Sequence, residues 1–372
     1  MVASRQSNCI DRFVTIPVPE QEPEEYLKAL KVLAYEEDAD LFIPVSSPVA
    51  SVYDARVARV LPPGCLSLSP GEAMTAALDD KVTFAEMARM AGCLVPETKR
   101  MTSKEAVHAF NDELRAQGAD AKRYILKNLQ YDSMHRLDLF TVPCAPEKLA
   151  AYLADPTITM TAEAPWACQQ FIVGDECCGH VVCHEGKLAL YTDNVASISC
   201  FNYQHLGDAR IRTWVSDFVA HHKLSGVMCF DFIVDETTKV PYAIECNPRM
   251  SSNITNFYDS PTVGAALLDT PAVAKSGLVE TPLPSSCESC WTAVDVWYAL
   301  SKPGLSLTQR AKEIYACLFE KKDAYFDPYD VLPFLALHYV HIPTLLARQI
   351  RKGNRWAKID MCIGKLTEEN GD

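Results

Sequence analysis

Two segments on either side of residue 240 each have the composition of a short β-strand, and a turn-forming run separates them. V-M-C-F-D-F-I-V at 227–234 is β-branched and aromatic, P-Y-A-I-E-C-N at 241–247 alternates, and D-E-T-T-K between them favours a turn. Because antiparallel neighbours place paired side chains on one face, we expect Asp231 and Glu245 to lie side by side. The sequence therefore predicts a hairpin that carries two adjacent carboxylates.

Two carboxylates held side by side repel each other unless a cation lies between them. Mg²⁺ takes oxygen ligands and commonly shares them with the phosphates of a substrate. Asn247 adds a neutral oxygen close to Glu245, and Arg249 can neutralise charge on a transferred phosphoryl group. We therefore predict a metal and phosphate site built from Asp231, Glu245, Asn247 and Arg249. The alternative is an acidic surface hairpin with a solvated arginine.

Composition limits the classes of function that are open to this chain. At 372 residues, it is long enough for two or three domains with buried cores. The net charge of −13 argues against broad affinity for nucleic acid, and no basic block suggests a local exception.

The cysteines indicate a reducing compartment. There are 15 of them, an odd number, and several lie in apolar runs where free thiols behave as small hydrophobic side chains. C-E-S-C at 287–290 has no second pair that would complete a zinc site, which favours structural thiols. The chain starts without an apolar signal segment and contains no unbroken apolar run of 18 residues. We expect a cytoplasmic protein with no membrane partner.

The first part of the chain predicts half of an α/β domain. Strand-like runs at 12–18 and 40–45 alternate with helical patterns at 23–37 and 53–60, which is typical of a parallel sheet. We predict that residues 1–75 form a partial N-terminal α/β domain.

The middle of the chain predicts a larger domain at residues 76–280, with a small lobe at about 98–170. A helix ending at Gly92 precedes the strand Y-I-L-K, and further strands are expected around 168–173 and 181–191. The predicted fold class is therefore α/β, built from α+β lobes.

Residues 281–372 predict a mainly helical C-terminal region. Within it, L-P-F-L-A-L-H-Y-V-H-I-P-T-L-L-A-R-Q-I-R-K at 332–352 has an apolar face and a basic end. Such a helix could lie on a membrane surface, but we expect a core-packed helix with a basic last turn.

Two lysines lie where phosphates could reach them. Lys81 is in the first turn of its predicted helix, and Lys127 ends the strand Y-I-L-K. Either one alone could be an ordinary solvated surface charge. The loop after Lys127 contains no glycine, so it would have to contact phosphates through the side chains of Ser133, His135 and Arg136.

Q-Q-F-I-V-G-D-E at 169–176 is a strand that runs into a turn. Such a segment can offer backbone amides to a purine and a carboxylate to a ribose. It could equally be an ordinary strand and turn, with Gly174 at a positive φ angle.

The order of these motifs resembles the ATP-grasp superfamily over about residues 78–259, and E-C-N-P-R is its most specific part. The resemblance implies ATP held between two α+β lobes, with Mg²⁺, which Mn²⁺ could replace, on the phosphates. It also implies roles for single residues. Lys81 and Lys127 would bind phosphates, Gln170, Phe171 and Ile172 would line the adenine pocket, Glu176 would reach the ribose, Asp231, Glu245 and Asn247 would hold the metals, and Arg249 would stabilise the phosphorylated intermediate.

Further segments resemble the mycosporine-glycine synthase type of ligase. They lie at 197–215, at 327–334 and at the end of the chain, W-A-K-I-D-M-C-I-G-K-L-T-E-E-N-G-D. In that group ATP phosphorylates an enol oxygen of 4-deoxygadusol, and an amino acid then displaces phosphate. Members of the group carry a fuller N-terminal domain, and the resemblance leads us to expect that this sequence starts inside it.

The leading hypothesis is a carbon–nitrogen ligase that uses ATP, an amino acid and a small acid or enol acceptor. Ligases of this architecture are often dimers, so a homodimer is expected. Asn202, Tyr203 and His205 would contact the acceptor, or else form a capped loop before a helix near Ala209. The alternatives are a carboxylase- or carbamoyl-phosphate-type subunit and an inactive ATP-binding protein with a truncated N-terminus.

Overall fold

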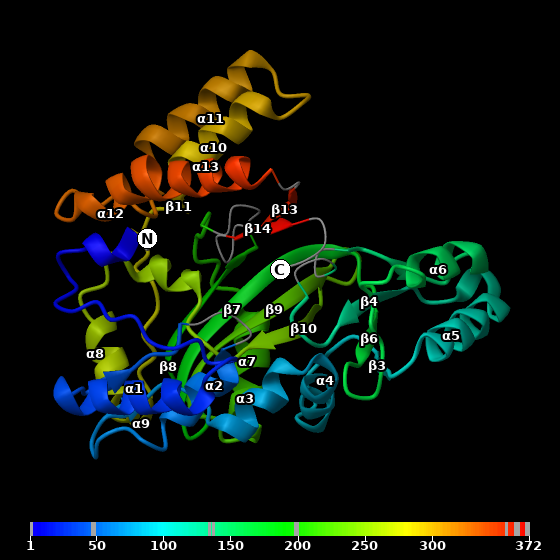
Figure 1. Cartoon of the computed structure of the whole chain (residues 1–372), viewed down its shortest axis with the longest axis horizontal. Coiled ribbons are helices and arrows are strands. Elements are labelled where there is room, and N and C mark those ends of the chain that lie inside the picture. The colour runs from blue at the N-terminus through cyan, green and yellow to red at the C-terminus, as the bar shows by residue number, and fades with distance from the viewer. Residues whose placement is uncertain are drawn as a thin grey trace.

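The computed structural model describes residues 3–45, 50–132, 135, 138–196, 201–353, 356–360 and 365–368, the last two stretches by their backbone alone. Two antiparallel sheets of four strands each form its framework, and helices pack around them (Figure 1). The predicted α/β fold class, with α+β lobes, is confirmed.

The larger sheet has the strand order β10-β9-β7-β8, and every neighbouring pair is antiparallel. The predicted hairpin is confirmed, because Glu245 and Asp231 are register partners. The prediction of one strand at 181–191 is wrong. Glu185 and Gly186 there have φ angles of 46° and 81°, so the chain reverses and forms a second hairpin. The strands are β7 (Gly174–His184), β8 (Lys187–Val195), β9 (Gly226–Asp235) and β10 (Pro241–Asn247).

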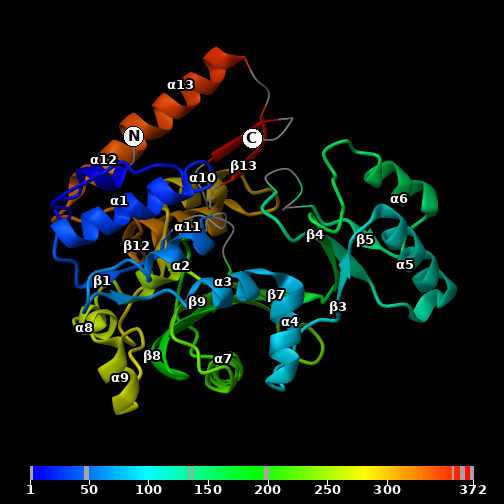
Figure 2. The same cartoon turned by 60° about the horizontal axis from the view of Figure 1, so that its bottom comes forward.

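The smaller sheet has the order β3-β6-β4-β5 and lies at one end of the molecule, beside helices α5 and α6 (Figures 1 and 2). Side chains from both helices and from the strands share one core, which includes Val107, Phe110, Leu149 and Trp166. The elements are β3 (Thr98–Met101), α5 (Lys104–Ala116), η2 (Gly118–Asp120), β4 (Tyr124–Asn128), β5 (Thr141–Val142), α6 (Pro146–Leu153) and β6 (Trp166–Gln170).

Helices α3 (Glu72–Asp79), α4 (Lys81–Met90) and α7 (Ala209–His221) contribute to the core of the larger sheet. Phe84 of α4 lies with its ring 5.6 Å from that of Phe218 and 6.1 Å from that of Trp214. Such buried aromatic side chains typically contribute about 3–5 kcal/mol each to stability. This packing fixes the start of α4 against β10.

The N-terminal part is less regular than predicted. Residues 12–18 form no strand and are mostly exposed, and the run at 40–45 shortens to a two-residue strand. Strand-like composition alone does not make a strand, because each strand needs a hydrogen-bonded neighbour. The elements are η1 (Ala3–Gln6), α1 (Pro23–Glu36), β1 (Leu41–Phe42), α2 (Ser51–Val57) and β2 (Leu66–Ser67), with β1 and β2 parallel.

Residues after 281 are mainly helical, as predicted, although the domain boundaries themselves stay predictions. Helices α10, α11 and α13 lie at the top of Figure 1, away from the larger sheet. Before residue 281, β10 is followed by η3 (Ser252–Phe257), α8 (Val263–Leu268) and α9 (Thr270–Ser276). After it, the elements are β11 (Ser289–Cys290), α10 (Thr292–Ser301), α11 (Leu307–Phe319), β12 (Lys322–Asp323), α12 (Val331–Ala336), η4 (Leu337–His341), α13 (Ile342–Lys352), β13 (Trp356–Asp360) and β14 (Lys365–Glu368).

The continuous helix Val331–Lys352 is not packed in a core, so that prediction is wrong. Its length and composition would allow it to cross a membrane, with a mean hydropathy of 1.2 over its most apolar window, of which 6% is buried. Apolar residues on this helix, such as Leu332, Tyr339 and Ile350, are 58–70% exposed. Its apolar face therefore has few partners within the described part of the chain.

Candidate active site

The two predicted carboxylates meet on one face of the larger sheet. A bulge in β10 between Ala243 and Glu245 shifts the register, so that Glu245 lies opposite Asp231 of β9. The Asn247 amide Nδ2 donates hydrogen bonds to both, at 3.1 Å to Asp231 Oδ2 and 3.4 Å to Glu245 Oε1. The hairpin thus brings these three oxygen-bearing side chains together.

Lys81 reaches this pair from the start of α4. Its Nζ lies 2.7 Å from Glu245 Oε2, and the two side chains are 21% and 31% exposed. Asp80 caps the helix by accepting hydrogen bonds from the N–H groups of Val82 and Thr83, at 3.0 and 2.9 Å. The cap fixes the first turn, and therefore the direction in which Lys81 leaves it.

The charges at this site are unevenly balanced. Lys81 holds the pKa of Glu245 at about 2, although burial opposes this. Burial raises the pKa of Asp231 well above its usual value, and the neighbouring Cys229 and Glu245 raise it further. Burial also raises the pKa of Asp79 to about 6, against the pull of Lys81. A divalent cation would relieve this excess of buried negative charge.

Asn247 and Arg249 complete the group. Arg249 Nη2 donates to Asn247 Oδ1 at 3.3 Å, so Asn247 turns its nitrogen toward the carboxylates and its oxygen toward the guanidinium. To act as a metal ligand, Asn247 would have to turn its amide over. Within the described ranges no three His, Cys, Asp or Glu side chains form a metal cluster. The donor set is therefore two carboxylates and an amide, which fits Mg²⁺ that also binds phosphate oxygens.

Lys127 and Glu176 lie near the same carboxylates but come from different sheets. Burial is the main cause that lowers the pKa of Lys127 in β4, with Lys81 adding to the effect and Glu245 opposing it. Burial likewise raises the pKa of Glu176 in β7, and Glu245 adds to this. The two predicted lysines and the predicted ribose carboxylate therefore all lie close enough to Glu245 to interact with it electrostatically.

The two sheets are joined beside the site by Gln169, a buried residue that sequence reasoning missed. Its Nε2 donates to the backbone oxygen of Ile244 at 2.9 Å. Ile244 is the bulged residue of β10, and the bulge sets the position of Glu245. This hydrogen bond therefore connects the smaller sheet to the bulge.

In the predicted adenine segment, two of the three backbone amides are not available to a purine. The Gln170 N–H donates to Glu97 O at 2.7 Å, and the Phe171 N–H donates to Arg123 O at 2.8 Å. Both amides are therefore already paired. Among the described residues the Ile172 N–H has no backbone partner, which makes it the donor of this segment that a base could use.

Gly174 does not have the positive φ angle that a turn at this point would require. It is the first residue of β7, and a Cβ there would lie 2.0 Å from the backbone oxygen of Val234. Close approach of two strands, and not a turn, therefore requires glycine at this position.

The loop after Lys127 is only partly described. His135 is buried, and its ring nitrogens contact Asp138 Oδ2 and Thr157 Oγ1, both at 2.8 Å. The prediction that His135 contacts phosphate is therefore wrong, since both nitrogens are engaged within the fold. Ser133 and Arg136 lie outside the described residues.

The three predicted acceptor residues lie between β8 and α7, in different environments. Asn202 hydrogen-bonds the Asp295 carboxylate, and Tyr203 is buried with its hydroxyl 2.7 Å from Ser252 Oγ. His205 borders a cavity of about 300 Å³. The segment ends in a capped helix, as the alternative expected, because Asp208 accepts a hydrogen bond from the Arg210 N–H at 2.8 Å.

No family model matches the sequence, and no curated protein matches it. Solved structures that are similar to this chain include the biotin carboxylase domain of Hydrogenobacter thermophilus 2-oxoglutarate carboxylase, in complex with MgADP and bicarbonate, at 14% identity and a TM-score of 0.48. Phosphoribosylamine–glycine ligase from Thermotoga maritima shares 11% identity, with a TM-score of 0.46. An L-amino acid ligase from Bacillus licheniformis shares 15% identity, with a TM-score of 0.45.

The matches cover most of this chain and varying shares of the others. They span 69%, 70% and 70% of this chain, and 58%, 76% and 63% of those three chains, in the order given. This chain thus matches less than two thirds of the length of the biotin carboxylase domain and of the L-amino acid ligase. None of these similarities identifies a substrate for it.

Proposed function

We propose that this protein is an ATP-dependent carbon–nitrogen ligase of the ATP-grasp type. The observation that carries the proposal is the contact of Lys81 with Glu245 beside Asp231, at a point where residues from both sheets converge. Adjacent acidic groups with a lysine in contact form the kind of site that binds Mg²⁺ together with a polyphosphate.

Each residue of the site has a proposed task. Asp231, Glu245 and Asn247 would hold Mg²⁺ or Mn²⁺, which supplies charge neutralisation on the phosphates. Lys81 and Lys127 bind phosphate oxygens, and Arg249 stabilises charge on the transferred phosphoryl group. Gln170, Phe171 and Ile172 line the adenine pocket, and Glu176 accepts hydrogen bonds from the ribose.

The proposed reaction needs no nucleophilic side chain. The γ-phosphoryl group of ATP passes to an oxygen of the acceptor, and an amine then forms the carbon–nitrogen bond as phosphate leaves. The protein contributes positioning and charge neutralisation. On the resemblance of residues 197–215 and 327–334, we propose 4-deoxygadusol as the acceptor and glycine as the amine, with Asn202, Tyr203 and His205 on the acceptor side.

Further proposals concern location and assembly. The 13 cysteines that the structure describes are all free thiols, which supports a reducing, cytoplasmic location. We also propose that the protein forms a homodimer, that its other partners are small molecules and that it does not bind nucleic acid.

The test is ADP release from the purified protein with Mg-ATP, 4-deoxygadusol and glycine, each omitted in turn. Glu245→Ala should abolish release, while Glu236→Ala, an exposed change in the turn after β9, should leave it intact. ADP release that needs both acceptor and amine supports the full proposal. Release with other acceptors only would keep the ligase and refute the substrates, and equal activity of the two variants would refute the site.

A further inference from the structure

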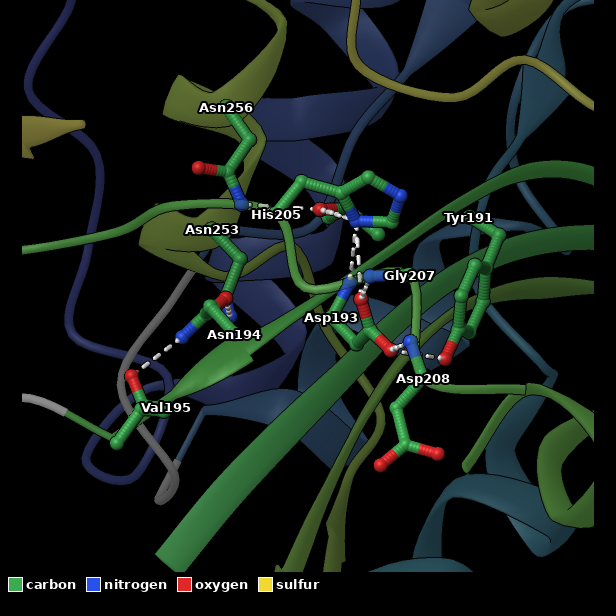
Figure 3. Close-up of polar contacts among 10 residues, drawn as sticks. Tyr191, Asp193, Asn194, Val195, His205, Gly207, Asp208, Asn253 and Asn256 are labelled. Carbon is green, nitrogen blue, oxygen red and sulfur yellow. Dashed lines mark hydrogen bonds and ion pairs between the residues drawn. The ribbon is translucent and has the colours of Figure 1, made fainter. Parts of the chain in front are cut away.

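A second polar centre lies at the far edge of the larger sheet, around Asp193 of β8 (Figure 3). The Asp193 side chain is fully buried, yet its carboxylate is surrounded by donors. It accepts hydrogen bonds from the N–H groups of Gly207 and Asp208, at 2.8 and 2.7 Å, and from Tyr191 Oη at 3.1 Å. Its Oδ1 also lies 2.9 Å from His205 Nδ1. A carboxylate held in this way is a fixed anchor for the imidazole.

The anchor decides which nitrogen of His205 carries the proton. Nδ1 is 2.9 Å from Asp193 Oδ1 but also 3.3 Å from the backbone nitrogen of Asp193, and it cannot donate to the first while accepting from the second. The shorter contact, to a charged oxygen, is the stronger one, so Nδ1 donates. The neutral ring therefore has a lone pair on Nε2, which has no hydrogen-bond partner among the described residues.

His205 borders a cavity of about 300 Å³, at the lower end of the size range of small-ligand pockets. The part of the cavity wall that the structure describes contains no Lys, Arg, Asp or Glu. Glu280, next to the lining residue Thr281, is already bonded to the hydroxyls of Ser260 and Thr262. The other lining residues are Gln204, Asn256, Ser286 and Cys287, with Pro282, Leu283 and Pro284 on the apolar side.

This lining excludes most charged ligands. A carboxylate or phosphate would find no lysine or arginine there, and an ammonium group would find no carboxylate. A hydroxyl group, in contrast, can donate to Nε2 and exchange hydrogen bonds with neutral amide and hydroxyl side chains. The prolines and Leu283 suit the carbon skeleton of the same ligand.

The cavity lies at the opposite end of a row of side chains that starts at the phosphate site. Asp231 pairs with Cys178 of β7, and Cys178 pairs with Asn194 of β8, so these three share one face. Two strand spacings separate Asp231 from Asn194, about 10 Å. Thr192, two residues before Asn194, lies with its Oγ1 3.3 Å from His205 Nδ1. Thr192 and Asn194 are themselves fully buried, and they accept hydrogen bonds from Asn256 and Asn253 of η3.

We propose that this cavity binds the hydroxylated, uncharged end of the acceptor, and that His205 Nε2 accepts a hydrogen bond from one of its hydroxyl groups. Asp193 is a positioning residue that holds the tautomer needed for this. The proposal rests on the proposed ligase function, since it places the acceptor with its reacting oxygen toward Lys81 and its hydroxyls toward β8.

Occupancy of the cavity can be measured without turnover through Cys287, an exposed thiol in its wall. The rate of Cys287 alkylation by iodoacetamide is followed by peptide mass spectrometry, with exposed Cys9 as the internal control. We expect 4-deoxygadusol to slow alkylation of Cys287 alone, and equal concentrations of glycine or inorganic phosphate to leave it unchanged. Protection by glycine or phosphate, or by none of the three, would overturn the assignment, even if ADP release shows that the chain is a ligase.

Kinetics then separate positioning from folding. His205→Gln and Asp193→Asn should raise KM for 4-deoxygadusol roughly tenfold to a hundredfold, with kcat and KM for ATP within about twofold. Asp217→Asn, the same change at an exposed carboxylate of α7, should leave all three constants near wild type. Cys287→Trp, which fills the cavity from an exposed position, should also raise KM for the acceptor. An unchanged KM in both His205→Gln and Cys287→Trp would contradict the proposal.

Discussion

Two aspartates in the larger sheet have opposite environments. Asp231 of β9 has Glu245 and the thiols of Cys178 and Cys229 beside it and accepts a hydrogen bond from the Asn247 amide, and burial raises its pKa well above the usual value. Asp193 of β8 is fully buried whereas Asp231 is half-buried, and the Asp193 carboxylate is surrounded by donors. Burial alone would raise its pKa, and the hydrogen bonds of His205, Gly207 and Asp208 bring it below the usual value.

The difference separates a carboxylate that the fold satisfies from one that it leaves under-compensated. A buried charge costs free energy unless hydrogen bonds or opposite charges compensate for it. Asp193 has that compensation within the chain and therefore contributes to stability and orientation. Asp231 accepts a hydrogen bond from the Asn247 amide but forms no ion pair within the described residues, and the proposed metal would supply that positive charge. That contrast supports the proposals that phosphate chemistry takes place at β9 and β10 and that acceptor recognition takes place at β8.

The largest effect is expected for Arg249, which lies beside Asn247 at the site of the under-compensated Asp231. Arg249→Ala should lower kcat for ADP release on the order of 10³-fold, because the positive charge acts on the transferred phosphoryl group. Steady-state kinetics measure this, together with the dissociation constant of Mg-ATP, which should change much less. Arg115→Ala, on α5 of the smaller lobe, is the matched control. A kcat within tenfold of wild type would remove Arg249 from the proposed chemistry.

Asp193→Asn tests the carboxylate whose charge the fold compensates. It should lower the free energy of unfolding by about 2–3 kcal/mol at pH 7, because a charged hydrogen-bond acceptor is lost from a buried site. Since the folded pKa lies below the usual value of about 3.9, the contribution is present above that pH and is lost as the pH falls through the folded pKa. Urea unfolding at pH 7 and at pH 3 should therefore show a difference between wild type and variant that shrinks in acid. A difference that is constant with pH would mean that the charge does not matter.

Lys127→Met should have the smallest of these effects. Burial lowers the pKa of Lys127, so the lysine carries a desolvation cost that phosphate binding would offset. Binding of Mg-ATP, measured by calorimetry, should weaken about tenfold, while stability without ligand stays equal or rises. Lys122→Met, at an exposed lysine paired with Glu97, should change neither. A variant that loses stability but binds ATP normally would make Lys127 a structural residue.

Local patterns predicted the parts of the fold that local chemistry determines. The hairpin that carries Asp231 and Glu245 was predictable because alternation and turn residues indicate both strands, whereas the bulge that pairs these two residues gave no sequence signal. The start of α4 was predictable for the same reason, since Asp80 is a typical cap before Lys81.

Sequence patterns could not predict the contacts between segments that are far apart in the chain. Asp79 was missed although it directly precedes the cap, because its burial beside Glu245 depends on how α3 packs against β10. Asp193 gave no local signal at all, since its donors come from residues that follow 14 and 15 positions later. The run at 12–18 was wrongly predicted as a strand because composition does not show whether a neighbouring strand exists.

Thermal unfolding with and without Mg-ATP tests the central contrast most directly, on wild type, Asp231→Asn and Asp193→Asn. The account predicts that Asp231→Asn melts no lower than wild type without ligand and loses the rise in Tm that Mg-ATP produces. Asp193→Asn should melt lower than wild type and keep that rise. If Asp231→Asn instead retains the full Mg-ATP shift, the carboxylates of β9 and β10 are not the nucleotide site, and the central claim is wrong.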